Sequence, residues 1–116
     1  MVKEFHLVLE RLKNNDSVKG IILTGQRNFF SVGLDVIELF DYDHNQIKKN
    51  FKDFGDLFLE LNSFPKIHIT AINGCAPTGG TLLAIASDYR IMAKDNKFTI
   101  GLNEVAVGVP SISKNY

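Results

Sequence analysis

The residues from 66 to 87 constrain the fold more than any other part of this chain. The run KIHITAI is rich in β-branched residues and predicts a strand at 66–72. The turn NGCAPTGG follows, and the apolar run after it predicts a helix at 79–87. A strand that passes through glycines into a helix leaves free backbone N–H groups at the helix start, where the helix dipole favours negative charge. The sequence therefore predicts a strand–turn–helix unit that could hold an anion.

The spacing of the glycines is compatible with more than one ligand at this turn. Gly74 and Gly79 are five positions apart, as in the phosphate-binding pattern G-x-x-x-x-G-K-[ST], but Gly80 stands where that pattern has lysine. Phosphate is one possible ligand. A developing oxyanion on a carbonyl group is another, and it needs only two well-aimed N–H donors. In a third interpretation the turn binds no ligand, and the glycines serve only a tight turn and close packing.

The other elements alternate along the chain. Helical spacing and strand-like runs predict helices at 3–14, 35–40 and 45–61, and further strands at 18–24, 89–93 and 97–100. This alternation is typical of an α/β protein with a parallel or mixed sheet covered by helices, and we expect residues 1–116 to form a single domain. The first helical pattern begins without room for an N-cap, so we expect the chain to be a piece of a larger protein.

Two further stretches are candidates for chemistry. The loop FFSVGLD at 29–35 also joins a strand to a helix, at the end of the strand where open α/β sheets bind ligands. It could supply a second N–H donor, or it could be a plain surface connection. Glu104 is a lone acid in IGLNEVAVGV. Apolar neighbours would raise its pKa and suit it as a general base, whereas most acids are solvated surface groups.

Composition excludes several classes of function. Thirteen basic and thirteen acidic residues cancel, which argues against nucleic acid as a partner. No apolar run approaches the roughly 20 residues that cross a membrane, so we expect a soluble, intracellular protein of the cytoplasm or the mitochondrial matrix. The single cysteine, Cys75, has no partner for an internal disulfide. The histidines, His6, His44 and His68, show no metal-ligand spacing, so no metal is expected.

Three blocks of sequence, in order, resemble the enoyl-CoA hydratase/isomerase, or crotonase, family. They are GIILTGQRNFFSVGLDVIEL, AINGCAPTGGTLLAIASDYRIMA and FTIGLNEVAVGV. The resemblance implies the α/β crotonase-like spiral of ββα repeats. Because family members are more than twice this length, it also implies a fold that is incomplete at both ends.

The resemblance also implies a substrate and a set of residues. The family binds acyl-CoA thioesters, in which coenzyme A is part of the substrate and no separate cofactor is needed. Full-length members are expected to be homotrimers. The thioester carbonyl oxygen would accept hydrogen bonds from the backbone N–H groups of Leu34 and Gly79. The same match implies substrate-binding positions at Ser31, Val32, Gly33, Asp35 and Asn103.

The acids at two positions indicate which reaction of the family to expect. Hydratases of the family use two glutamates to activate a water, and the first of these positions is Leu82 here. The second is Glu104. A single carboxylate suits the Δ3,Δ2-enoyl-CoA isomerase reaction, in which it would take a proton from C2 and return it at C4. Two alternatives stay open: an enoyl-CoA hydratase, and a non-catalytic remnant of the fold that at most binds CoA.

Overall fold

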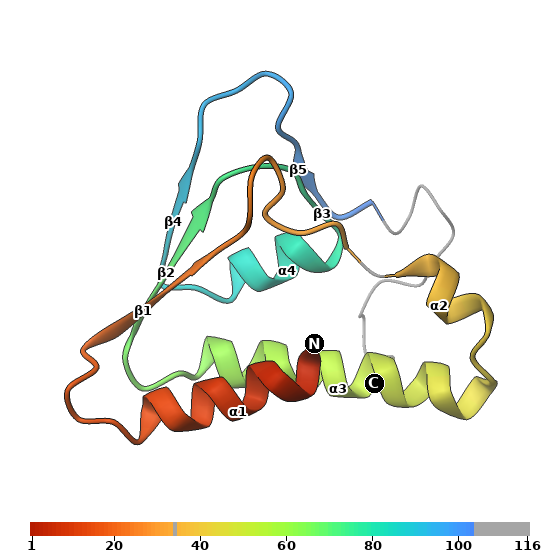
Figure 1. The fold of residues 1–116 in the computed structure, drawn as a ribbon, viewed down its shortest axis with the longest axis horizontal. Coiled ribbons are helices and arrows are strands. Elements are labelled where there is room, and N and C mark those ends of the chain that lie inside the picture. Colours follow the sequence, from red (N-terminus) through yellow and green to blue (C-terminus); the bar gives the residue numbers. More distant parts are fainter. Residues whose placement is uncertain (34, 104–116) are drawn as a thin grey trace, which may run out of the picture.

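The computed structural model describes residues 1–33 and 35–103 (Figure 1). The predictions that concern Leu34 and Glu104 lie outside these residues. The elements along the chain are α1 (Val2–Lys13), β1 (Gly20–Thr24), α2 (Val36–Phe40), α3 (His44–Asn62), β2 (Ile67–Ile72), β3 (Ala76–Pro77), α4 (Gly79–Ile85), β4 (Tyr89–Met92) and β5 (Ile100–Gly101). That residues 1–116 form a single domain stays a prediction, because the description ends at Asn103.

The main sheet is parallel, as the alternation of elements predicts. Its strand order is β1-β2-β4, and Ile69 of β2 pairs with Ile22 on one side and Tyr89 on the other. A second parallel pair joins β3 to β5. The two strands predicted around the turn at 94–96 therefore lie in different sheets. The prediction placed the second of them at 97–100, whereas β5 spans Ile100–Gly101.

Helices cover one face of the main sheet. In Figure 1, α1 and α3 lie side by side beneath the strands, and α4 lies between them and the sheet. The α3 helix starts at a capping box, in which the Asp43 side chain accepts from the Gln46 N–H and the Gln46 side chain accepts from the Asp43 N–H. Lys66, just before β2, donates to the carbonyl oxygens of Leu12 and Asn15 at 2.7 and 2.6 Å and so ties the end of α1 to the sheet.

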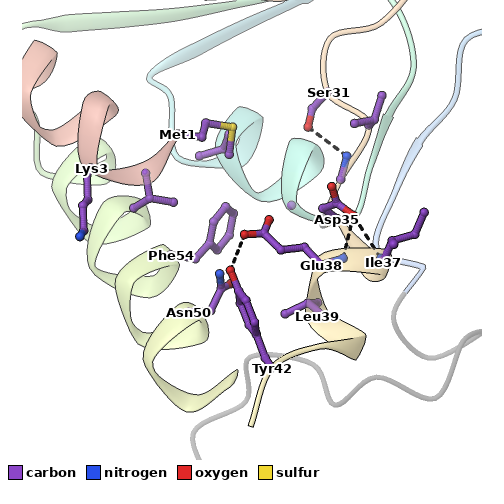
Figure 2. Close-up of a pocket in the computed structure, with 15 residues that line it drawn as sticks. Met1, Lys3, Ser31, Asp35, Ile37, Glu38, Leu39, Tyr42, Asn50 and Phe54 are labelled. Carbon is purple, nitrogen blue, oxygen red and sulfur yellow. Dashed lines mark hydrogen bonds between the residues drawn. The ribbon is translucent and has the colours of Figure 1, made fainter. Parts of the chain in front are cut away.

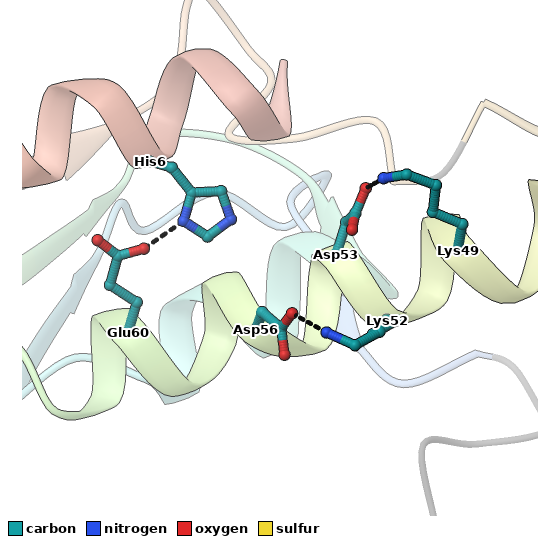
Figure 3. A network of polar contacts seen from close by, with 6 residues as sticks. All are labelled: His6, Lys49, Lys52, Asp53, Asp56 and Glu60. Carbon is teal, nitrogen blue, oxygen red and sulfur yellow. Dashed lines mark hydrogen bonds and ion pairs between the residues drawn. The ribbon is translucent and has the colours of Figure 1, made fainter.

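Charged side chains of α3 form three polar pairs. Figure 3 shows His6 of α1 in contact with Glu60 of α3, the one pair in this view that joins the two helices. Two further pairs lie within α3 at i,i+4 spacing: Lys49–Asp53 and Lys52–Asp56. Exposed pairs of this kind contribute little to stability because water screens them. The helix packing therefore depends on the apolar side chains between the helices and the sheet.

The buried core lies between the helices and the sheet. Its six buried members come from α1, α3 and the region of α4: Leu9, Phe54, Leu57, Leu61, Leu83 and Ala86. Ile21 and Leu23 of β1 pack against this cluster from the sheet. Complete burial of one such leucine contributes about 1.5–3 kcal/mol.

The opposite face of the main sheet stays open in the described part of the chain. Side chains from all three strands of the sheet are exposed there: Ile22 70%, Ile67 62%, Tyr89 63% and Ile91 56%. Parallel sheets normally have both faces covered. The part of the protein described here thus presents an apolar sheet face to solvent.

His68 is buried on the covered face of β2. Its side chain is 1% exposed, and among the described residues neither ring nitrogen has a hydrogen-bond partner. Burial lowers the pKa of His68 below the ordinary value of 6.5, with the nearby Asp88 carboxylate and the Leu61 carbonyl opposing the shift. Folding therefore favours the neutral imidazole of His68 more than the unfolded chain does.

This burial predicts a loss of stability in mild acid. Below pH 6.5, the ordinary pKa, the unfolded chain takes up a proton that folded His68 resists, so the free energy of unfolding falls as the pH is lowered. We expect His68→Leu to weaken this dependence between pH 7 and 5, measured by urea unfolding at each pH. The exposed His44→Leu is the matched control and should follow the unsubstituted chain. Identical pH profiles for His68→Leu and the unsubstituted chain would contradict the prediction.

Candidate functional site

Two glycine-containing loops meet at the carboxyl ends of β1 and β2. The loop at 25–33 follows β1, and the turn at 73–80 follows β2, its neighbour in the sheet. The Cys75 carbonyl oxygen accepts from the backbone N–H groups of Phe30 and Ser31 at 3.0 and 3.1 Å, and the Cys75 N–H donates to the Asn28 carbonyl at 3.2 Å. The Asn73 side chain adds two more bonds, accepting from Gly25 N at 2.9 Å and donating to the Arg27 carbonyl at 2.8 Å.

Glycine is required where these two loops touch. A Cβ atom added at Gly74 would lie 2.1 Å from the Asn28 carbonyl oxygen, and one added at Gly80 would lie 2.7 Å from the Ser31 Cβ. Distances this short leave no room for a side chain, so close packing by itself requires glycine at Gly74 and Gly80. This packing does not exclude a ligand at the turn, since backbone packing and ligand binding use different atoms.

The backbone just before α4 adopts an unusual conformation. Thr78 has φ +53° and ψ −113° and is the N-cap residue of α4, and within the described residues its side chain makes no capping hydrogen bond. A β-branched residue at positive φ is strained, at a cost of about 1–3 kcal/mol, and such strain is concentrated at functional sites. The Thr78 N–H donates to the Gly101 carbonyl at 2.8 Å, which helps to hold this conformation.

The two loops open onto one cavity of about 780 Å³ (Figure 2). A volume of this size is typical of small-molecule sites. Its lining comes from both loops and from all four helices. Five of the residues that the sequence suggests line it together: Ser31, Val32, Gly33, Asp35 and Gly79.

Polar bonds fix the loop side of this cavity. The Ser31 Oγ accepts from the Gly33 N–H at 3.2 Å, and Gly33 itself has φ +84°, a conformation that favours glycine. The Asp35 carboxylate is the N-cap of α2 and accepts from the N–H groups of Ile37 and Glu38, each at 3.1 Å. Asp35 therefore orients the start of α2 beside the cavity.

Of the three remaining predicted site residues, only Asn103 belongs to the described part of the chain. Asn103 is exposed and does not line the cavity. Leu34 and Glu104 fall outside the described residues, so their predicted roles stay predictions.

Other residues of the cavity carried no signal in the sequence. Phe54 of α3 extends beneath the turn, and its Cζ atom would lie 3.2 Å from a Cβ added at Gly79. Glu38 accepts a hydrogen bond from the Tyr42 hydroxyl within the cavity, as Figure 2 shows, and this bond raises the pKa of Tyr42. Asn50 of α3 also lines the cavity. The pattern of α3 marks Phe54 only as one more apolar residue of a buried stripe.

Within 1–33 and 35–103, no group of three or more His, Cys, Asp or Glu side chains is arranged to hold a metal ion. Over the same ranges, no helix has both the length and the apolar character needed to cross a membrane.

Comparison with known proteins gives a consistent result. The family model for Enoyl-CoA hydratase/isomerase matches residues 1–113. Enoyl-CoA delta isomerase 1, mitochondrial, of Mus musculus is 42% identical over 107 residues, covering 91% of this chain and 37% of that protein. The crystal structure of human mitochondrial delta3-delta2-enoyl-CoA isomerase matches with a TM-score of 0.89 at 37% identity, covering 95% of this chain and 43% of that one. The enoyl-CoA hydratase structure from Bacillus anthracis matches with a TM-score of 0.86 at 28% identity, covering 93% and 42%.

The chain belongs to the enoyl-CoA hydratase/isomerase family, because the family model covers nearly all of it. The resemblance of the three sequence blocks and the predicted fold class, a part of the α/β crotonase fold with parallel sheets, are thereby confirmed. The chain spans 37% of the length of the mouse isomerase and 43% of the human structure.

The contact between Gly80 and Ser31 predicts a measurable coupling between the two loops. Gly80→Ala should destabilise the chain by about 1–3 kcal/mol, because the new methyl group would overlap the Ser31 Cβ. In Ser31→Gly the overlapping atom is gone, so the double variant should recover part of the loss. A double-mutant cycle by urea unfolding should give a coupling free energy of about 0.5–3 kcal/mol.

Gly55→Ala is the matched control for this cycle. A Cβ at Gly55 meets nothing within 4 Å, and the residue lies in α3, so alanine should stabilise the chain by up to about 1 kcal/mol. Additive effects of Gly80→Ala and Ser31→Gly would show that the two loops do not touch as described.

Proposed function

We propose that the cavity binds an acyl-CoA thioester and that the backbone N–H groups of Leu34 and Gly79 hold its carbonyl oxygen. One observation carries this proposal: Gly33 and Gly79, from separate loops, line the same cavity. Hydrogen bonds around the Cys75 carbonyl hold these loops against each other. Leu34 directly follows Gly33 in the sequence, and Gly79 opens α4. Family membership supports the thioester as the ligand class.

The chemistry follows from where charge develops. Removal of a proton next to a thioester carbonyl places negative charge on the carbonyl oxygen. Backbone N–H donors fixed in advance stabilise that charge without reorganising, and loss of one such donor typically costs about 3–4 kcal/mol. A turn with no lysine can perform this role, so the proposed ligand does not require lysine at position 80.

Glu104 is our candidate for the group that moves the proton. It would take a proton from C2 of a 3-enoyl-CoA and return it at C4, giving the 2-enoyl-CoA with no net gain or loss of atoms. The position at which hydratases of the family carry a first glutamate is Leu82 here. Leu82 packs against the buried core, where an ionised carboxylate would be costly. This packing favours the isomerase reaction over hydration.

A second candidate function is binding of CoA thioesters without catalysis. The observation that favours it is the open apolar face of the main sheet, which within the described residues lacks the cover that parallel sheets normally have. We also propose, from family membership, that the full-length protein is a homotrimer.

Glu104→Gln tests the catalytic proposal. In the protein expressed with any native flanking sequence, this change should lower kcat for conversion of 3-enoyl-CoA to 2-enoyl-CoA by about 10²–10⁴-fold, the usual contribution of a general acid–base group. The exposed Glu10→Gln serves as the control and should keep full activity. Undiminished isomerisation by Glu104→Gln would rule out its role.

Two further assays separate the alternatives. Hydration of crotonyl-CoA by the unsubstituted protein would favour the hydratase. Binding of acyl-CoA with neither isomerisation nor hydration would favour the non-catalytic function.

A further inference from the structure

The Thr81 hydroxyl lies at a junction of three elements near the site. Thr81 belongs to the first turn of α4, two positions after Gly79, and its residue is 6% exposed. Its Oγ1 accepts from the Gly101 N–H at 2.8 Å. The same oxygen lies within hydrogen-bond distance of the carbonyl oxygens of Ala76 and, at 3.1 Å, Gly101. The hydroxyl thus joins α4, β3 and β5.

The number of hydrogens decides how these contacts are shared. A hydroxyl has one hydrogen to donate and two lone pairs that accept. The Ala76 carbonyl is the nearer acceptor, so the hydroxyl donates mainly there and accepts from the Gly101 N–H. The Gly101 N–H of β5 thus bonds to the Thr81 hydroxyl of α4, which in turn bonds to the Ala76 carbonyl of β3. These bonds lie beside the pairing of Pro77 with Gly101.

Within the described residues, the β5 strand has few other bonds to hold it. It pairs with β3 over only two residue pairs, Ala76 with Ile100 and Pro77 with Gly101, and proline has no N–H to donate. Two backbone bonds join the strands to the residues that flank them: Ala76 N to Thr99 O and Thr78 N to Gly101 O, each at 2.8 Å. The bond between the buried Thr81 side chain and Gly101 is therefore a large share of the hydrogen bonds that hold β5 in place.

We propose that Thr81 is a positioning residue that sets the place of β5 relative to the turn at Gly79. In the sequence, β5 leads directly to Asn103 and Glu104. Thr81 and Gly79 share one helix, so the hydroxyl links the strand that precedes the proposed base to the element that carries the proposed oxyanion donor. The catalytic part of this inference rests on the proposed function. The structural part does not.

Amide hydrogen exchange in the 116-residue chain tests the structural part. Thr81→Val keeps the shape of the side chain and removes the hydroxyl, so exchange at the Gly101 N–H should rise about 10-fold or more relative to the amides of β2. Thr81→Ser should restore the protection. Ser87→Ala is the matched control, because it deletes another buried hydroxyl of the same region, one that donates to the Ala84 carbonyl at 2.7 Å. It should leave the ratio of Gly101 to β2 exchange unchanged.

The exchange result can overturn the proposal by itself. If Gly101 exchange in Thr81→Val rises only in step with the β2 amides, or rises as much in Ser87→Ala, the hydroxyl does not fix β5.

Kinetics test the catalytic part. In the active protein, Thr81→Val should lower kcat for the double-bond shift about 10- to 100-fold, as expected for misplacement of a catalytic group by about 1 Å, with KM changed less than about threefold. Thr81→Ser should recover most of kcat. An equal loss in Thr81→Val and Ser87→Ala, or a loss confined to KM, would overturn the positioning role. Absence of isomerase activity in the unsubstituted protein would instead refute the proposed function, while the exchange experiment would still decide the role of Thr81 in the structure.

Discussion

The close approach of the backbone at 25–33 to the backbone at 73–80 is the constraint on which the site depends. A side chain at Gly74 would overlap the Asn28 carbonyl, and a Cβ at Gly80 would lie 2.7 Å from the Ser31 Cβ. Because both positions are glycine, the Cys75 backbone can bond to the facing loop through both its N–H and its C=O. The loop that leads into α2 and the turn that starts α4 are thereby brought to one cavity, which explains how residues far apart in sequence form a single lining.

Much of the fold follows from local sequence pattern. The strand–turn–helix unit at 66–87 and the amphipathic helix α3 are strongly patterned, and the structure has both. A strand was expected at 97–100, close to β5, but its pairing with β3 was not predicted, because a strand as short as Ala76–Pro77 has no periodicity to detect. Pairing of this kind is decided by tertiary contacts such as that of Thr81 with Gly101.

The predictability of the site differs between its backbone and its side-chain parts. Glycine spacing indicated the turn at Gly79, and the position between a strand and a helix indicated the loop at Gly33; both glycines line the cavity. The contact of Phe54 with the turn could not be predicted, because a helix stripe shows that a residue is buried but not which residue it meets. The same holds for the bond between Glu38 and Tyr42, which looks in the sequence like an ordinary i,i+4 pair. The roles of Leu34, Glu104 and Asn103 stay predictions.

The central claim is that two backbone N–H groups in this cavity polarise a thioester carbonyl. Isotope-edited infrared spectroscopy of a bound acyl-CoA labelled with ¹³C at the thioester carbon measures that polarisation directly. Hydrogen bonding to the carbonyl oxygen weakens the C=O bond, so the account predicts a lower stretching frequency for the bound than for the free thioester. A bound thioester whose carbonyl frequency equals that in water, or lies above it, would contradict the account.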